Sequence, residues 1–263
     1  MYQEQEGTVK LAGLLSISFK IVNGTRQGSV LSPIFFSLYL DDLLKKLRKM
    51  SLGCHISGIW YGALGYADDL ILMSPSRESM AKMLKTCEEY AEEHNLAFST
   101  DPNPNKSKSK CLYFCGKENV LYPKKLTLNG EDLPFVKQAT HLGHELHQNG
   151  NMNFDIQTKK ARFIQDSISI RETFGFAEPS QVLKATRVYA GHYYGSMLWD
   201  INSDMCGQYC RVWNTSVKLV FNVPRSCHTY LVQNVLAPEH LPIRTELMSR
   251  FVTFYKSLTT CPS

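Results

Sequence analysis

Apolar and polar positions divide the chain into a mixed first part and a helical second part. Residues 18–22 alternate polar and apolar side chains, which predicts a strand, and Asn23-Gly24 then predicts a turn. Two apolar runs, 59–64 and 70–73, flank a short polar segment and predict a β-hairpin. Further short strands are expected around residues 111–115, 125–128 and 140–146.

Apolar residues at helical spacing predict the helices. One begins at Ser32-Pro33, where Ser32 is expected to cap it and Pro33 to occupy its first position. A second is expected over residues 76–94. From residue 154 onward the pattern is helical throughout, with segments expected at 154–174, 179–197, 204–221 and 242–258. Asn149-Gly150 therefore marks an expected boundary between an α+β domain, 1–150, and an all-α domain, 151–263.

Composition excludes extensive disorder and gives a weak indication of the partner. The 263 residues are 43% hydrophobic, which suits one large domain or two modest ones. The net charge of +5 is uneven, because residues 1–150 hold 17 Lys/Arg against 16 Asp/Glu and the remainder holds 12 against 8. The basic second part permits phosphate contact, although a solvated surface has the same composition.

No apolar run reaches the roughly 18 residues of a membrane span, so no membrane association is expected. The apolar stretch 11–19 follows Glu4 and Glu6, where a signal peptide carries positive charge, and the chain is therefore expected to be intracellular. The eight cysteines form no C-x-x-C pair, which favours reduced thiols.

Two groups of residues raise the alternative of a zinc site. Neither group has the ligand spacing of a standard closed site or of a metalloprotease helix. The groups are Cys206 and Cys210 with Cys227-His228, and His141, His144, Glu145 and His147.

The most informative segment is Tyr66-Ala67-Asp68-Asp69 at the expected hairpin turn. Phosphoryl transfer by polymerases uses two divalent ions, and hard cations such as Mg²⁺ prefer carboxylate oxygens. Adjacent Asp68 and Asp69 on a rigid turn would supply such ligands. The simpler alternative is a solvated Asp-Asp turn, a common turn composition.

A second segment, Arg26-Gln27-Gly28, lies just before the capped helix. Gly28 permits close approach of a nucleotide or template backbone, Gln27 can bond a base or sugar edge, and Arg26 can meet a phosphate. Alone, this is an ordinary strand-to-helix loop. The occurrence of both segments in this order favours a nucleic-acid enzyme.

In these motifs the chain resembles the reverse transcriptases of non-LTR (LINE-type) retrotransposons. Residues 24–33 with Tyr39-Leu40-Asp41-Asp42-Leu43 look like motif B and its helix, and residues 66–72 look like motif C. Residues 98–100 with 105–108 are similar to the end of motif D. His141-Leu142-Gly143 looks like motif E, the primer-grip turn, and residues 213–217 are similar to the region beyond the thumb.

The resemblance implies an α+β fold: a partial palm of antiparallel sheet and helices, then an all-α thumb and helical extension. It implies DNA synthesis from dNTPs on an RNA template and DNA primer, with Mg²⁺ or Mn²⁺, in the nucleus or the cytoplasm. The residues implied are Asp68 and Asp69 as metal ligands, Tyr66 beside the primer end, Arg26, Gln27 and Gly28 at the template and nucleotide, and Lys106 or Lys108 as proton donor to pyrophosphate.

The basic residues of the helical part are the expected phosphate contacts, through which nucleic acid would bind in a salt-sensitive, sequence-blind way. They are Lys159, Lys160, Arg162, Arg171, Lys184 and Arg187.

One departure from the family pattern concerns the third carboxylate, an Asp of motif A on a strand upstream of motif B. No Asp precedes Asp41 in this chain, and Asp41 and Asp42 belong to the motif B helix. The chain alone is therefore expected to be inactive. The alternative function is a truncated, inactive element remnant that at most binds nucleic acid; an RNA-dependent RNA polymerase or maturase-like palm is a further alternative, against which Ala67 and the Arg26-Gln27-Gly28 segment argue.

Overall fold

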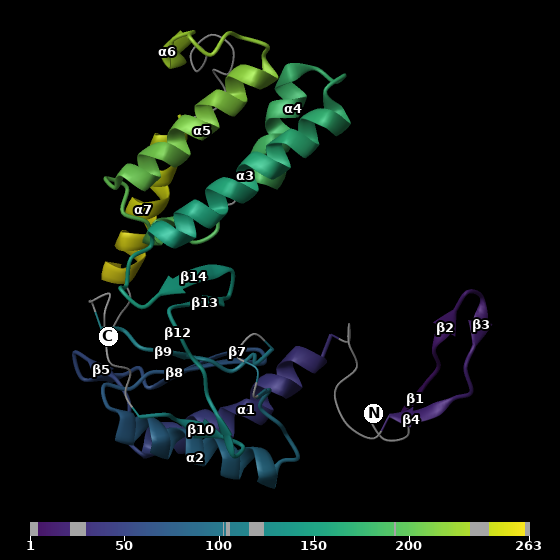
Figure 1. The fold of residues 1–263 in the computed structure, drawn as a ribbon, viewed down its shortest axis with the longest axis vertical. Helices are drawn as coiled ribbons and strands as arrows, with labels where there is room; N and C mark the ends of the chain where they lie inside the picture. Colours follow the sequence, from purple (N-terminus) through teal and green to yellow (C-terminus); the bar gives the residue numbers. More distant parts are fainter. Residues whose placement is uncertain are drawn as a thin grey trace. The chain divides into compact units, whose positions relative to one another are not determined.

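The computed structural model describes residues 5–21, 30–101, 103, 106–115, 124–191, 193–231 and 242–260 (Figure 1). Helices and short strands are mixed along the chain, which confirms the α+β class. The chain forms two compact units, a first unit of Met1–Ser109 with Pro123–Pro134 and a second unit of Lys110–Tyr122 with Phe135–Ser263. The division differs from the expected boundary at residue 150, because residues 135–150 group with the helices that follow.

In the first unit the described strands form separate antiparallel pairs rather than one palm sheet. The predicted strand at 18–22 is confirmed as β4, while Asn23-Gly24 lies outside the described residues. The pairs are β1 (Gln5–Gly7) with β4 (Phe19–Ile21), β2 (Lys10–Leu11) with β3 (Leu14–Leu15), β5 (His55–Ile56) with β6 (Ile59–Trp60), β7 (Ala63–Tyr66) with β8 (Asp69–Leu72), and β10 (Thr127–Leu128) with β11 (Glu131–Asp132).

Two helices, α1 (Ser32–Lys49) and α2 (Arg77–Glu93), supply most of the core of the first unit, and β7 adds Ala63. Ser76 caps α2, because its side chain accepts from the Ser79 amide at 3.2 Å, as its type and position predict. The expected cap of α1 is wrong: Leu31 is the N-cap, and no side chain bonds there. The core consists of Leu43, Leu47, Ala63, Met83, Cys87 and Tyr90.

Polar bonds also join the two helices. The Tyr90 hydroxyl donates to the Tyr39 carbonyl, and the Tyr39 hydroxyl donates to the His94 carbonyl at 2.6 Å. The His94 ring stacks on Tyr90 with centroids 3.9 Å apart. Together with the apolar core, these bonds fix α1 and α2 as the base on which the β7–β8 hairpin rests.

The second unit begins with two strand pairs. β9 (Cys111–Leu112) and β12 (Phe135–Val136) are parallel, in contrast to the expected antiparallel sheet. β13 (Gln138–His141) and β14 (His144–His147) form an antiparallel hairpin, so the single strand expected at 140–146 is wrong. Leu142 and Gly143 have φ of 47° and 76°, the type I′ pattern that reverses the chain between them.

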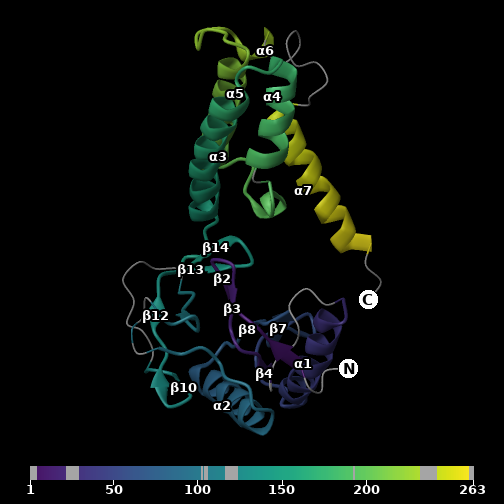
Figure 2. The same cartoon turned by 90° about the vertical axis from the view of Figure 1, so that its right-hand side faces the viewer.

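The helices of the second unit are α3 (Asn153–Phe174), α4 (Pro179–Ala185), α5 (Asp204–Val220), α6 (Thr229–Leu231) and α7 (Ile243–Thr260). A π-helical turn follows α4 at Thr186–Ala190, and a 3₁₀ turn covers Ser196–Leu198. α3 and α5 run side by side (Figures 1 and 2). The single helix expected at 179–197 is wrong: the helical segment ends at Ala190, and Gly195 has a positive φ of 72°, which an α-helix does not adopt.

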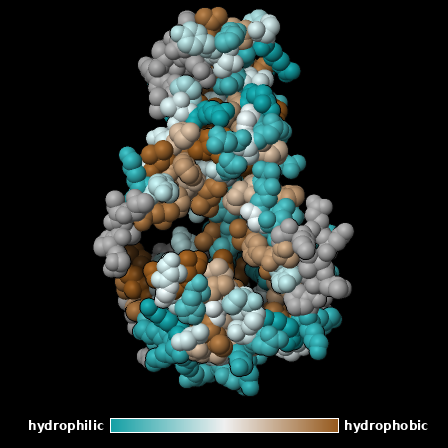
Figure 3. All heavy atoms as spheres, turned by 90° about the vertical axis from the view of Figure 1, so that its left-hand side faces the viewer, coloured by the Kyte–Doolittle hydropathy of each residue, from teal (hydrophilic) through white to brown (hydrophobic). Residues whose placement is uncertain are grey.

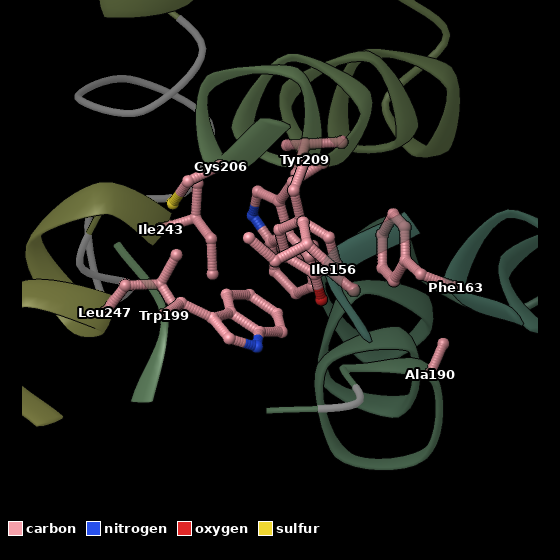
Figure 4. Packing of buried hydrophobic residues seen from close by; sticks show 11 residues of the cluster. Ile156, Phe163, Ala190, Trp199, Cys206, Tyr209, Ile243 and Leu247 are labelled. Atoms are coloured by element: carbon pink, nitrogen blue, oxygen red, sulfur yellow. The ribbon is translucent and has the colours of Figure 1, made fainter. Parts of the chain in front are cut away.

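Aromatic side chains fill the core of the second unit (Figure 4). The Phe163 ring stacks on Trp213 with centroids 5.0 Å apart, and Trp199 meets Tyr209 edge-on at 5.2 Å. The Tyr209 hydroxyl donates to the Gly191 carbonyl at 2.6 Å, which satisfies the one polar atom this ring brings inside. α3, α5 and α7 all contribute to this core.

Many apolar side chains remain on the surface, and Figure 3 shows them in brown among hydrophilic residues. In the first unit they include Ile34, Phe35 and Leu38 on α1 and Leu64 on β7. In the described ranges, no helix is both long and apolar enough to span a membrane.

Candidate functional site

The β7–β8 hairpin places two carboxylates at its tip. In its register Tyr66 pairs with Asp69, which leaves Ala67 and Asp68 as the two turn residues. Ala67 has a φ of 50° whereas Asp68 does not have a positive φ, so only the first turn residue has the positive φ that non-glycine residues rarely adopt. Four other hairpins instead have glycine with positive φ second in the turn: Gly13, Gly58, Gly130 and Gly143.

The two faces of this hairpin differ in burial. Ala63, Leu70 and Leu72 belong to the core of the first unit or pack against it. Cross-strand partners share a face and neighbours along a strand alternate, so Tyr66 and Asp69 lie on the opposite face. On that face Tyr66 is 67% exposed and Leu64 is 51% exposed. This outer face is therefore open, whereas the inner face packs against the core of the first unit.

Asp68 and Asp69 are both exposed, and within the described ranges no cation pairs with either. The neighbouring acidic pair on α1 differs, because Lys45 Nζ lies 2.5 Å from Asp41 Oδ2 and 3.5 Å from Asp42 Oδ1. The hairpin carboxylates are thus available to an external cation. Among the described residues no three His, Cys, Asp or Glu side chains gather as a metal site, so the turn offers two ligands at most.

Lys106 and Lys108 lie in the loop between α2 and β9, and both are exposed. Ser107 between them is buried, and its hydroxyl donates to the Ser109 carbonyl at 2.7 Å. The Ser109 amide in turn bonds the Ser99 carbonyl at 3.1 Å. The loop is thus anchored through its serines and leaves both lysines toward solvent. In the part of the chain described, no hydrogen bond or ion pair joins either lysine to Asp68 or Asp69.

The other candidates of the first part, Arg26, Gln27 and Gly28, lie outside the described residues. The structure therefore brings Tyr66, Asp68 and Asp69 together and gives Lys106 and Lys108 a place on a separate loop of the same unit.

The expected phosphate contacts of the second unit divide into exposed and engaged residues. Arg162 and Arg171 are exposed on α3. Lys160 Nζ donates to Gln208 Oε1 at 2.8 Å, and Arg187 forms an ion pair with Glu246. Lys159 is buried, so its assignment as a phosphate contact is wrong: its ammonium bonds Asp155 instead of facing solvent.

Sequence reasoning missed the buried polar cluster around Lys159. It consists of Asp155, Lys159, His144, the backbone of Tyr194 and the Trp199 indole. The Asp155–Lys159 spacing of four residues is visible in the sequence, but that spacing is equally typical of an exposed helix pair. The histidine considered for zinc, His144, stacks on the Tyr194 ring at 5.0 Å.

Comparison with known proteins assigns residues 8–146 to a family described as "Reverse transcriptase (RNA-dependent DNA polymerase)". The chain is 32% identical over 124 residues to the "Retrovirus-related Pol polyprotein from type-1 retrotransposable element R2" of Nasonia vitripennis. It is 35% identical over 72 residues to the corresponding type-2 element R2DM polyprotein of Drosophila melanogaster. The matches cover 46% and 27% of this chain but only 11% and 7% of those two proteins.

Proposed function

Because this chain belongs to the reverse transcriptase family, we propose that its β7–β8 hairpin holds the metal ions of templated DNA synthesis. The R2 relatives confirm the resemblance to non-LTR retrotransposon enzymes, and the comparisons do not favour an inactive remnant. The observation that carries the proposal is the pair Asp68, in the two-residue turn, and Asp69, which follows it as the first residue of β8. Both are exposed and have no cation partner in the described residues.

The donor set of the turn fits Mg²⁺ or Mn²⁺ as part of a shell. Carboxylate oxygens suit hard cations, which keep water and phosphate as their remaining ligands. We assign Asp68 as the main ligand and Asp69 as the weaker one. When bound, the metal ions activate the primer 3′ oxygen and neutralise the triphosphate.

The remaining roles follow the same assignment. Tyr66 shares a face with Asp69 and would border the primer terminus. Arg26, Gln27 and Gly28 would line the template and the incoming dNTP. An exposed lysine, Lys106 or Lys108, would donate a proton to the leaving pyrophosphate. The partners of the reaction are an RNA template, a DNA primer and dNTPs.

The first unit with the β13–β14 hairpin would then be part of a palm, and the helices from α3 onward a thumb and extension. Within these 263 residues the hairpin supplies two carboxylates, whereas the chemistry of the family uses a third from a neighbouring strand. The exposed side chains of Leu64, Ile34 and Phe35 offer apolar surface in the same unit. Because the hairpin supplies only two of the three carboxylates, the 263-residue polypeptide by itself would not extend a primer.

Metal binding tests the ligand assignment directly. We expect the polypeptide to bind Mn²⁺ weakly, measured by electron paramagnetic resonance of free Mn²⁺, because two carboxylates leave the shell incomplete. Asp68→Ala should weaken binding more than Asp69→Ala. Asp41→Ala is the matched control, since Asp41 belongs to an acidic pair already engaged by Lys45. An effect of Asp41→Ala equal to that of Asp68→Ala would contradict the assignment.

Primer extension on an RNA template tests the reaction. We expect no product from the polypeptide alone, and product when a second polypeptide carrying the motif A strand of a related element is added. That product should disappear with Asp68→Ala. Extension that occurs without the added polypeptide and depends on Asp68 would overturn the proposed need for a third carboxylate. Extension that survives Asp68→Ala would overturn the catalytic assignment.

A further inference from the structure

The buried cluster of the second unit is built around an ion pair that stability alone does not require. Asp155 and Lys159 lie one turn apart on α3, with side chains 1% and 6% exposed and Nζ 2.8 Å from Oδ2. Removing two such charges from water is costly, and well-packed apolar residues in the same places are often as stable. A buried pair of this kind is best attested where it fixes one arrangement of neighbouring elements.

Asp155 connects three elements. Its Oδ2 accepts from Lys159 and from the Trp199 indole, each at 2.8 Å. Its Oδ1 accepts from the backbone amide of Glu145 on β14 at 3.1 Å. In the register of the hairpin, Glu145 lies opposite Thr140, and its amide bonds Asp155 instead of the partner strand. The Asp155 carboxylate on α3 therefore accepts the one backbone N–H of Glu145 that points away from the partner strand β13.

Lys159 and the segment after Ala190 complete the restraint. The Lys159 ammonium donates to the Tyr194 carbonyl at 2.7 Å and lies 3.3 Å from His144 Nδ1. Gly195 follows, and a Cβ built there would lie 1.6 Å from His144 Cε1. The ring of His144, the residue that directly follows the turn Leu142-Gly143, therefore leaves no room for a side chain at position 195.

We infer that Asp155 is a positioning residue: through Glu145 and Lys159 it fixes the β13–β14 turn to α3, so that hairpin and helix contact a nucleic-acid duplex as one rigid surface. The inference rests on the proposed function, because a rigid hairpin matters for binding only if this unit contacts template and primer. Asp155 contacts no substrate itself and acts through the hairpin.

The test compares Asp155→Asn with Tyr209→Phe in the full chain. Asn keeps the shape of the side chain but removes its charge, and Tyr209→Phe removes a buried hydrogen bond of the same core without touching either strand of the hairpin. Amide hydrogen exchange is measured at residues 138–147 and in α5, and affinity is measured for an RNA–DNA duplex with a recessed 3′ end. Trp199→Phe, which removes one bond to Asp155 and keeps an aromatic ring, serves where Asp155→Asn does not fold.

We expect Asp155→Asn to raise exchange in the hairpin about tenfold more than in α5, and to weaken duplex binding by a similar factor. Tyr209→Phe should change neither the exchange in the hairpin relative to α5 nor the affinity for the duplex. Exchange that rises equally in hairpin and α5 means a merely structural residue and overturns the inference, as does a loosened hairpin with unchanged duplex affinity. If the unmodified chain does not bind the duplex, the proposed function of this unit fails instead, and the hairpin exchange still shows whether Asp155 restrains it.

Discussion

Replacement of Lys159 by methionine distinguishes two roles for this residue, a phosphate contact and one half of a buried ion pair. The sequence places Lys159 among the phosphate contacts of a basic helix, whereas the structure buries its ammonium against Asp155, the Tyr194 carbonyl and His144. Methionine has nearly the same length and apolar stem, so packing is largely kept. What changes is the charge and the hydrogen bonds that it donates.

The size of the effect follows from burial. An exposed pair of residues four apart on a helix contributes about 0.3–0.5 kcal/mol. Here both side chains are almost fully buried. Loss of the ammonium leaves the Asp155 carboxylate with the Trp199 and Glu145 donors and with the His144 ring, whose Nδ1 lies 3.8 Å from Oδ1. It also removes the bond to the Tyr194 carbonyl. Removal of one partner of a buried pair costs about 3–5 kcal/mol. We therefore expect Lys159→Met to lower the free energy of unfolding by several kcal/mol.

Urea titration followed by tryptophan fluorescence measures this loss, because Trp199 and Trp213 both lie in the core of the second unit. With a dependence on urea of about 2–3 kcal/mol per M, the midpoint should fall by roughly 1–2 M. Lys160→Met is the matched control. Its ammonium donates to Gln208 at 2.8 Å at a partly exposed site, and its loss should cost under about 1 kcal/mol.

The opposite outcome is equally specific. A phosphate contact would leave the free energy of unfolding unchanged and reduce the salt dependence of nucleic-acid affinity by about one unit on a log–log plot. A loss of stability no larger than that of Lys160→Met, together with that reduced slope, would show that the Lys159 ammonium faces solvent and refute the buried cluster.

Three further outcomes can be measured. Ala67→Gly should raise the urea midpoint, since Gly relieves a positive φ that costs Ala about 1 kcal/mol; a lower midpoint would contradict this conformation of the turn. Burial, and then the charge of Lys159, lower the pKa of His144 from its ordinary 6.5, so the unfolded chain takes the proton more readily, and stability present above pH 6.5 is lost as pH falls below it. His144→Phe should reduce that loss, and an unchanged pH profile of the midpoint would contradict the shift. Burial raises the pKa of Cys87 to about 12, so iodoacetamide near neutral pH should label it only in urea, and labelling of Cys87 itself in the native chain would show an accessible thiolate.

Local chemistry explains which parts of the fold are predictable. The α2 helix follows from Ser76 as its cap and a buried stripe at helical spacing, both of which act within a few residues. The turn at Asp68 likewise follows from two apolar runs flanking a polar step. In each case neighbouring residues alone determine the outcome.

The errors arise where distant residues decide. The helical segment expected over 179–197 ends at Ala190 instead. Beyond it, a Cβ at Gly195 would meet the ring of His144, a proximity across more than fifty residues that no periodicity records. Lys159 has the spacing of a surface pair, and only the packing of Trp199 and Tyr194 around it makes it internal. The candidate site was predictable as a turn, whereas its open outer face at Leu64 was not.

The division of the chain into two units has a consequence for how the protein can be dissected. The polypeptide passes between the units three times, because residues 123–134 return to the first unit between β9 and β12 of the second. In that excursion the Asn129 amide bonds the Glu88 carboxylate, and the Lys124 and Lys125 carbonyls accept from Arg77. A recombinant fragment ending at residue 109 would strip α2 of these bonds, and one starting at residue 135 would deprive β12 of its partner strand. Neither half is therefore a modular, excisable domain, and expression boundaries should enclose both.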